Sequence, residues 1–378
     1  MDICLDYQPA VAQRAGIGRY TRLLARYLPE LLGKDDRLSL FYLDFSRKGD
    51  PPDAPGAIDH PWRLLPGTLL QQLWKRGLPP HFDTLAGKAD LYHFTNFVIP
   101  PLSSKAKAVS TIFDMSFARL PQCAEAKNLA YLEARIGKTV KRADAIITIS
   151  DFSAEEIATF HPAAKGKTFS IPLGLDQTLT APPTEKVSEV RKRLGLEKPY
   201  ILSVGTLEPR KNYTFLVDAF EALGRDDIDL VIAGMPGWRC EPILDKLEHS
   251  SRASQIHYLK FVQDSDLAAL YAGAELFAIT SLYEGFGFPP LEAMQCGTPV
   301  VSSAGGSLPE VLGEAADIVR SYDAGEWASA LAKMLDDTER REAYIDRGRA
   351  QARLYRWEET ARKTLEVYRA VMEGKVGR

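Results

Sequence analysis

Two glutamates flank a short segment of glycines and aromatic residues that could hold an anionic ligand. Glu284 precedes Gly285-Phe286-Gly287-Phe288, and Pro289-Pro290 and Glu292 follow it. Glycines let a backbone approach a ligand closely, prolines suit the first turn of a helix, and the free N–H groups of that turn can hold phosphate oxygens. The pattern predicts an anion-binding loop that runs into a helix, with Glu292 able to take a pair of ribose hydroxyls. Alternatively, Glu292 is only a helix glutamate stabilised by the helix dipole.

A second candidate is the basic pair Arg210-Lys211, which lies just after an expected strand, Tyr200 to Gly205. Open α/β sheets bind ligands beyond the carboxyl ends of their strands. Two positive charges there could neutralise a diphosphate leaving group, a role that a magnesium ion has in other enzymes. A solvated Arg-Lys pair is the commoner case, and the dipeptide alone does not decide between the two.

Two candidates lie in the first half of the chain. Gly16 and Gly18 open an expected helix from Arg19 to Leu28, and its free N–H groups could face a phosphate or an acceptor. About ten residues separate Gly16 from the first strand, so a dinucleotide-binding fingerprint is disfavoured. His93 ends another expected strand and is a candidate catalytic group, although a histidine among aromatic residues is more often structural.

The elements that would position these residues alternate along the whole chain. Short apolar runs are followed by longer helical stretches, which predicts an α/β protein with two parallel sheets. The expected strands of the first half are Asp2 to Asp6, Leu38 to Tyr42, Asp90 to Phe94, Ala108 to Asp114 and Asp144 to Ser150. Those of the second half are Tyr200 to Gly205, Leu230 to Gly234, Ile256 to Phe261, Leu276 to Thr280 and Pro299 to Ser303. The proline-rich stretch from Asp50 to Pro61 is expected to be a surface loop.

We divide the chain into an acceptor-binding domain (1–175), a linker (176–195), a donor-binding domain (196–355) and a final helix (356–378). The helix, from about Trp357 to Met372, has one apolar stripe. That stripe packs either on its own domain or back on the first domain.

Composition narrows the function further. Of 378 residues, 45% are hydrophobic and 26% charged, as in ordinary globular proteins. Four scattered cysteines suggest neither a zinc site nor a disulfide framework. The start has no signal-peptide character and no apolar run reaches the ~20 residues that span a bilayer, so we expect a cytoplasmic protein.

Charge is unevenly spread along the chain. Residues 1–172 carry 22 Lys+Arg and 18 Asp+Glu, a net charge of +4. Since the whole chain has a net charge of −3, the remaining residues carry −7. This is either ordinary drift or a basic half that contacts an anionic membrane face peripherally. The excess is too small for nucleic-acid binding.

Glu284 and Glu292, with Gly285-Phe-Gly-Phe-Pro between them, resemble the ExxxxxxxE motif of the retaining GT-B glycosyltransferases of family four, which use nucleotide sugars. Four more segments resemble that family in the same order along the chain. They are Gly16-Ile-Gly-Arg-Tyr20, Ile171-Pro-Leu-Gly-Leu-Asp176, Ser203-Val-Gly-Thr-Leu-Glu-Pro-Arg-Lys-Asn212 and Ala304-Gly-Gly-Ser-Leu-Pro-Glu310.

The resemblance implies two Rossmann-like βαβ domains that face a central cleft. In such enzymes the matching Arg210 and Lys211 clasp the diphosphate, Glu292 holds the ribose and Glu284 contacts the donor sugar, with no metal or other cofactor. The family usually has a histidine where this chain has Phe113. Asp114 is retained and becomes the candidate base or sugar contact of the first domain. The donor-binding residues implied are Gly16, Gly18, Gly205, Thr206, Arg210, Lys211, Glu284, Gly285, Phe286, Gly287, Phe288 and Glu292.

The motifs most resemble bacterial mannosyltransferases that build O-antigen or capsule. They imply GDP-mannose as donor and a glycan or lipid-linked glycan as acceptor, with UDP-, dTDP- and ADP-sugars as alternatives. Front-face displacement is favoured, and a double displacement with Glu284 or Asp114 as nucleophile stays open. Two rival functions are a sugar-nucleotide epimerase, which would need no acceptor, and a non-catalytic glycan- or nucleotide-binding module.

Overall fold

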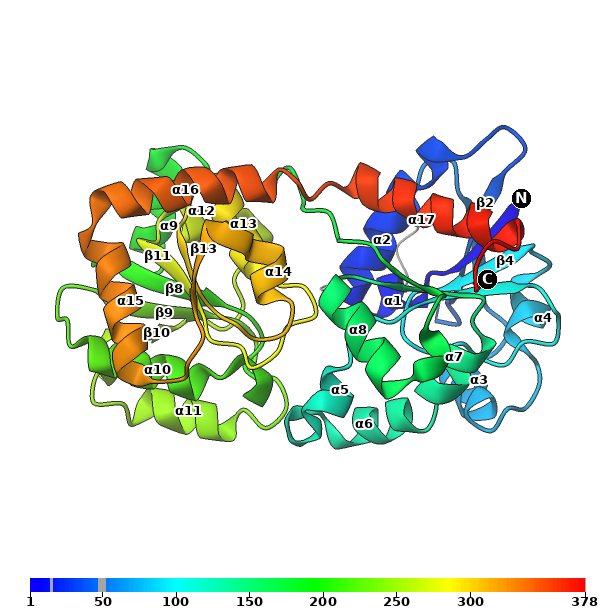
Figure 1. Ribbon diagram of the computed structural model, residues 1–378, viewed down its shortest axis with the longest axis horizontal. Helices are drawn as coiled ribbons and strands as arrows, with labels where there is room; N and C mark the ends of the chain where they lie inside the picture. Colours follow the sequence, from blue (N-terminus) through cyan, green and yellow to red (C-terminus); the bar gives the residue numbers. More distant parts are fainter. Residues whose placement is uncertain (14–15, 47–51, 378) are drawn as a thin grey trace. The chain divides into compact units, whose positions relative to one another are not determined.

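The computed structural model describes residues 1–13, 16–46 and 52–377. Its contacts divide the chain into two compact units. Unit 1 comprises Met1–Ala118, Ala126–Gly174 and Trp357–Arg378, and unit 2 comprises Arg119–Glu125 and Leu175–Arg356. Each unit is a parallel sheet with helices packed on it (Figure 1).

The sheet of unit 1 has the strand order β3-β2-β1-β4-β5-β6-β7, with every neighbour parallel. The central strands are buried on both faces, which explains their apolar runs. The strands are β1 (Asp2–Asp6), β2 (Arg37–Leu43), β3 (Ile58–Trp62), β4 (Leu91–Phe94), β5 (Lys107–Thr111), β6 (Ala145–Thr148) and β7 (Thr168–Ser170).

Strands β3 and β7 were not predicted, and the surface loop expected from Asp50 to Pro61 is wrong where β3 begins. Asp50 and Pro51 lie outside the described residues. Pro61 is tolerated because β3 is an edge strand, where a missing N–H removes no central ladder bond. The proline-rich composition therefore led to a wrong prediction for this strand.

Unit 2 has the strand order β10-β9-β8-β11-β12-β13, again with every neighbour parallel. Five of its strands match the predicted positions to within a few residues, and β13 was not predicted. The strands are β8 (Tyr200–Val204), β9 (Asp229–Ala233), β10 (Ile256–Tyr258), β11 (Leu276–Ile279), β12 (Val300–Ser303) and β13 (Ala316–Val319).

Helices follow most strands, as the alternation predicted. Before the start of unit 2's first strand they are α1 (Gln8–Ala12), α2 (Ile17–Tyr27), α3 (Gly67–Lys75), α4 (Phe82–Ala86), α5 (Ser116–Arg119), α6 (Ala126–Glu133), α7 (Ile136–Arg142), α8 (Asp151–Phe160) and α9 (Thr184–Arg193). The others are α10 (Tyr213–Leu223), α11 (Glu241–Glu248), α12 (Asp264–Ala272), α13 (Phe288–Gln295), α14 (Leu308–Leu312), α15 (Ala324–Asp336), α16 (Thr338–Ala352) and α17 (Trp357–Met372). Helix α9 occupies much of the stretch assigned to a linker.

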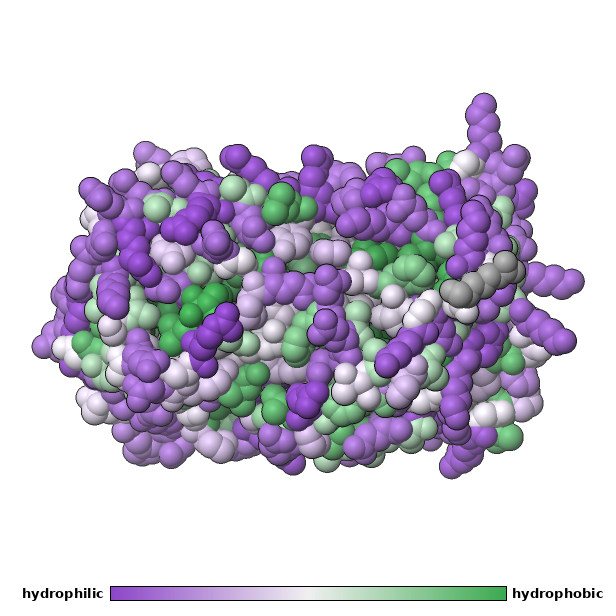
Figure 2. All heavy atoms as spheres, in the orientation of Figure 1, coloured by the Kyte–Doolittle hydropathy of each residue, from purple (hydrophilic) through white to green (hydrophobic). Residues whose placement is uncertain are grey.

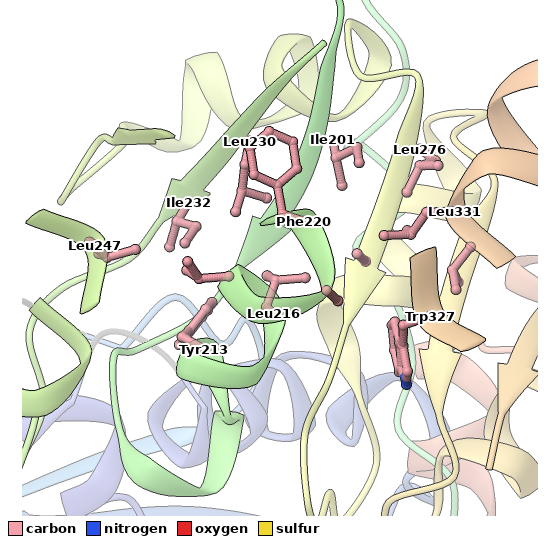
Figure 3. Packing of buried hydrophobic residues seen from close by; sticks show 14 of the residues in the cluster. Ile201, Tyr213, Leu216, Phe220, Leu230, Ile232, Leu247, Leu276, Trp327 and Leu331 are labelled. Atoms are coloured by element: carbon pink, nitrogen blue, oxygen red, sulfur yellow. The ribbon is translucent and has the colours of Figure 1, made fainter. Parts of the chain in front are cut away.

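One hydrophobic cluster of unit 2 lies between its sheet and helices α10 and α15. Phe220 of α10 points toward Leu230 and Ile201 of the strands, and Trp327 of α15 belongs to the same cluster (Figure 3). Trp327 is fully buried, and its indole N–H donates to the carbonyl of Ser321. Burying an aromatic of this size stabilises the packing by about 1.5–3 kcal/mol or more.

Helix α17 packs within unit 1, on α2. Its stripe is buried as predicted, from Trp357 to Tyr368. The chain before it passes so close that a Cβ on Gly174 would lie 2.3 Å from the backbone nitrogen of Trp357. The Thr360 hydroxyl donates to the Pro172 carbonyl at 2.8 Å. The end of the chain therefore completes the fold of its first half.

The surface is mainly hydrophilic on the face that Figure 2 shows, with hydrophobic patches between the polar side chains. Among the helices built from described residues, none is long and apolar enough to cross a membrane.

Strand order fixes where each sheet can bind a ligand. In unit 1 the order reverses direction between β1 and β4, and in unit 2 between β8 and β11. At such a switch point the connections leave toward opposite faces of the sheet, which opens a crevice beyond the carboxyl ends of the two strands. Each unit therefore has one position that favours a ligand.

A buried hydrogen-bond chain in unit 1 should make Tyr368→Phe destabilising. The change leaves one ring nitrogen of His93 without the phenol that lies 2.5 Å away, at a site closed to water. Loss of such a partner costs about 1–3 kcal/mol. Urea unfolding should show that loss, whereas Tyr131→Phe, which removes a phenol from an exposed ring, should change little. Equal stability of the two variants would contradict a stabilising role for this chain of hydrogen bonds.

Candidate active site

The predicted basic pair lies at the switch point of unit 2. The chain leaves β8 at Gly205, whose φ of +155° favours glycine, and passes through a short 3-10 turn at Pro209–Lys211 before α10. The Leu282 N–H donates to the Arg210 carbonyl at 2.8 Å, which ties this turn to the segment after β11. The sheet topology thus brings together two segments that lie 70 residues apart.

Glu284 pairs with both basic residues. Its carboxylate accepts from the Lys211 ammonium at 2.6 Å and from the Arg210 guanidinium at 2.9 Å. The Ser281 hydroxyl donates to the same oxygen as Lys211, at 2.6 Å. On its other side Arg210 contacts Glu208 at 2.5 Å. The four charged side chains are largely buried and sum to zero, so each charge has an opposite charge beside it.

The pKa of Glu284 shows how strong this pairing is. Burial raises the pKa of the carboxyl, but the charges of Lys211 and Arg210, with hydrogen bonds from Lys211 and Ser281, outweigh burial and lower it to about 2. Glu284 is therefore ionised throughout the physiological range. A carboxylate held this firmly is a binding group and is poorly suited to protonate a leaving group.

A pair of adjacent glycines packs against the glutamate loop. A Cβ on Gly305 would lie 2.1 Å from the Ser281 carbonyl oxygen, and one on Gly306 would lie 2.3 Å from the Glu284 carbonyl oxygen. Ser307 donates to that Glu284 oxygen through its N–H at 2.9 Å and its hydroxyl at 3.0 Å. The Ala304-to-Glu310 motif thus fixes the backbone that carries Glu284.

The loop after Glu284 runs into α13, as the sequence predicted. Gly287 caps the helix at φ +101°, and a Cβ there would approach Leu308 Cδ2 to 2.8 Å. Gly285 and Phe286 are buried, while Phe288 is half-buried and lies edge-on to Phe286. These two aromatic side chains contact each other and therefore help to shape the loop.

Glu292 lies inside α13 and is buried. The Tyr271 hydroxyl donates to its carboxylate at 3.0 Å. This bond orients the carboxylate from the neighbouring helix α12. A ribose-binding role for Glu292 stays a prediction, and Tyr271 is a second residue on which it would depend.

Thr206, from the same strand-to-turn segment, is exposed beside Gly205. Gly205 is partly exposed, and a Cβ there would lie 3.1 Å from the Tyr213 hydroxyl and 3.5 Å from Lys211 Cε. The glycine thus lets the Lys211 side chain fold back along the turn.

In unit 1 the glycine loop opens α2, as expected. Gly16 has φ +57° and open space around it, whereas a Cβ on Gly18 would lie 1.9 Å from the Gln13 carbonyl oxygen. Gly18 is thus required by packing. Asp114 is partly exposed after β5, and one of its oxygens accepts from the Ser116 N–H at 2.9 Å. Phe113 is buried edge-on to Tyr20 and offers no polar group in place of the family's histidine.

His93 is not placed for catalysis. Its ring is fully buried, with its two nitrogens against Tyr368 at 2.5 Å and Thr111 at 2.8 Å. Thr111 in turn contacts the Tyr20 hydroxyl at 3.0 Å. Burial lowers the pKa of His93 to about 3, so the ring is neutral. This burial and the two side-chain contacts favour the structural alternative for His93.

Sequence reasoning missed three polar residues that support Glu284 and Arg210. They are Glu208, Ser281 and Ser307. Glu208 could have been suspected, since an acid two residues before a buried arginine is a natural partner. Nothing in the spacing of Ser281 and Ser307 distinguishes them from ordinary loop serines.

The described residues offer no group of three or more His, Cys, Asp or Glu side chains that could hold a metal ion. All four cysteines are free and buried. Reaction without a metal stays a prediction.

Comparison with known proteins gives consistent matches. The model of the family described as glycosyl transferases group 1 matches residues 186–351. The chain is 34% identical to O-antigen chain mannosyltransferase B of Escherichia coli, over 98% of this chain and 100% of that one. It is 33% identical to the MMP alpha-(1->4)-mannosyltransferase of Mycolicibacterium hassiacum, over 59% and 53% of the two chains.

Two solved structures share the fold over almost the whole chain. Sucrose-phosphate synthase from Thermosynechococcus elongatus superposes with a TM-score of 0.74 at 21% identity, covering 99% of each chain. HepE from Anabaena, in complex with UDP and glucose, superposes with a TM-score of 0.72 at 18% identity, covering 98% and 99%.

Replacing Glu284 by Gln should destabilise the protein in a pH-dependent way. Because the folded pKa of about 2 lies below the usual 4.5, Glu284 stabilises the fold above pH 4.5, and this stability is lost as the pH falls toward 2. Breaking a buried pair costs about 3–5 kcal/mol. Urea unfolding at pH 7, 5 and 3.5 should show a deficit that shrinks with acid.

The control is Glu248→Gln, an exposed residue at the end of α11. It should match the unaltered protein at each pH. A Glu284→Gln deficit that is the same at pH 7 and pH 3.5 would argue against the ion pairs as its source.

Gly305→Ala should displace the glutamate loop. The new Cβ meets a backbone oxygen at 2.1 Å, and overpacking of this kind costs about 1–3 kcal/mol. The matched control is Gly137→Ala in α7, where the nearest atom is 3.9 Å away and alanine favours the helix. Thermal unfolding should separate the two, and a fully stable Gly305→Ala protein would show that the loop can move at no cost.

Proposed function

The chain belongs to the group 1 glycosyl transferases and is a hexosyltransferase of GT-B fold, and from this premise we propose that it transfers mannose from GDP-mannose to a lipid-linked saccharide. The transfer retains the configuration of the sugar and serves the synthesis of a bacterial cell-surface polysaccharide. One observation carries the proposal: a lysine and an arginine, largely buried at the switch point of unit 2, are oriented by Glu284.

Lys211 and Arg210 suit a diphosphate. The Lys211 ammonium donates one hydrogen bond, to Glu284, and has no other partner among the described residues, so it can donate further. Arg210 is fixed by Glu208 on one side and by Glu284 and the Tyr283 carbonyl on the other. Donors preorganised in a largely buried site stabilise developing negative charge without reorganising during the reaction.

The reaction follows from this charge placement. The acceptor hydroxyl oxygen bonds to the anomeric carbon on the face that the diphosphate leaves, as the bond between that carbon and the phosphate oxygen breaks. The hydroxyl proton passes to the departing diphosphate oxygen, while Lys211 and Arg210 stabilise the remaining charge. Glu284, ionised and oriented, accepts hydrogen bonds from hydroxyls of the donor sugar.

Support for the donor comes from the relatives. The protein with which the chain aligns from end to end is named an O-antigen chain mannosyltransferase, and a second relative is also named a mannosyltransferase. Support for Glu292 as the ribose contact is its burial beside Tyr271 on α12.

A membrane face is the proposed location of the acceptor. Leu64, Leu69 and Leu78 are exposed around α3. Exposed Lys75 and Arg76 lie in the same segment. Apolar side chains with basic neighbours favour peripheral contact with anionic lipid headgroups.

The donor site is tested by thermal unfolding with GDP, UDP, dTDP or ADP in the absence of metal. A ligand that binds only the folded protein raises the midpoint with its occupancy, and at a hundredfold excess over Kd the gain is about 2.7 kcal/mol. GDP should raise it, and Lys211→Ala should abolish the rise and lower turnover of GDP-mannose at least about 100-fold.

Lys186→Ala, which removes a partly exposed lysine from α9, is the control and should keep both the GDP-induced rise and the turnover. A rise with UDP alone would replace the proposed donor. No rise with any nucleotide would overturn the diphosphate site itself.

A further inference from the structure

Asp6 occupies the switch point of unit 1. It is the last residue of β1 and lies in register with Phe41 of β2 and Phe94 of β4. The order of the sheet reverses between β1 and β4, so Asp6 stands where a ligand of this unit would bind. This is the same topological position that Gly205 and the basic turn occupy in unit 2.

The carboxylate has little support from the protein. One oxygen accepts from the Gln8 N–H at 3.2 Å, and among the described residues no other group donates to the carboxylate. No described lysine, arginine or histidine pairs with it either. Burial raises the pKa of Asp6 to about 7, only partly offset by the Gln8 bond. An acid left unpaired in a half-buried site lowers stability, and such a cost is typical of binding and catalytic positions.

The backbone around Asp6 is held firmly. Its carbonyl oxygen accepts from the Thr95 hydroxyl at 2.9 Å, and Thr95 is also bonded to Thr21 of α2. These threonines are fully buried. The strand end is therefore rigid, which suits a side chain that must present two oxygens in a fixed direction.

Polar and aromatic groups suited to a sugar lie nearby. The negative charge of Asp6 contributes, after burial and against Arg135, to the raised pKa of Tyr131, so the phenol of α6 is within electrostatic range of the carboxylate. Arg135 and Lys75 lie over the Tyr131 ring at 5.2 and 5.6 Å. Two cations beside this ring favour an acceptor that carries a phosphate group beyond its sugar.

We propose that Asp6 binds the acceptor, its carboxylate accepting hydrogen bonds from adjacent hydroxyls of the acceptor sugar beside the hydroxyl that attacks. The inference rests on the proposed function, because it needs a saccharide acceptor. Asp6 orients this sugar. In its ionised form the carboxylate has one unbonded oxygen and one singly bonded oxygen, and it can accept from two neighbouring hydroxyls at once.

The test compares Asp6→Asn with Asp2→Asn, a control at the exposed opposite end of the same strand. Each protein is assayed with GDP-mannose in two ways. One assay measures transfer to a synthetic diphosphate lipid that ends in mannose, and the other measures hydrolysis of the donor by water. Thermal unfolding with GDP checks the fold and the donor site.

Asp6→Asn should lose about 10- to 100-fold in kcat/KM for transfer, as expected for one or two charge-assisted hydrogen bonds. Hydrolysis of the donor and the rise in the unfolding midpoint with GDP should equal those of the unaltered protein. The unfolding midpoint without ligand should equal or exceed that of the unaltered protein, since a half-buried charge without a cationic partner is removed. Asp2→Asn should leave transfer, hydrolysis and thermal unfolding with GDP unchanged.

Two results would overturn the inference while the proposed function stands. Transfer by Asp6→Asn at the normal rate would exclude contact with the acceptor. Equal losses of transfer, hydrolysis and GDP binding would show a structural role. If the unaltered protein neither binds GDP nor transfers mannose, the proposed function fails, and the assignment of Asp6 fails with it.

Discussion

The bonds of one buried carboxylate, Glu284, organise the candidate site of unit 2. Its two oxygens hold Lys211 and Arg210, and its backbone oxygen holds the loop of Gly305 and Ser307. A buried ion cluster is stable only while every member keeps its partners. Three chain segments, after β8, β11 and β12, are thus fixed relative to one another, and a ligand phosphate would meet donors that are already oriented.

Parallel sheet topology decides where such clusters can form. In both units consecutive strands are added first to one side of the starting strand and then to the other, and at the reversal the connections leave toward opposite faces of the sheet. Gly205 and the basic turn lie at one such point, and Asp6 lies at the other. The first position holds Lys211 and Arg210 paired with Glu284, whereas the second holds a carboxylate that no described basic side chain pairs with.

In the core of unit 1, by contrast, buried polar groups hydrogen-bond to one another. Tyr368, His93, Thr111 and Tyr20 form a closed chain of hydrogen bonds from α17 through two strands to α2. All are buried and neutral, so their contribution is to specify packing between elements distant in sequence. Asp6 differs because, within the described part of the chain, only the Gln8 N–H donates to its carboxylate. This difference separates a structural polar residue from a candidate binding residue within one sheet.

The sequence by itself determined the fold class, the position of most strands and the Glu284, Arg210 and Lys211 motifs, because apolar periodicity and glycine-rich turns are local signals. It could not reveal β3, whose proline is tolerated only at an edge, nor the burial of His93. It also missed Glu208, Ser281 and the setting of Asp6. Pairing, burial and switch-point position depend on which distant strand lies alongside, so only the tertiary structure decided them.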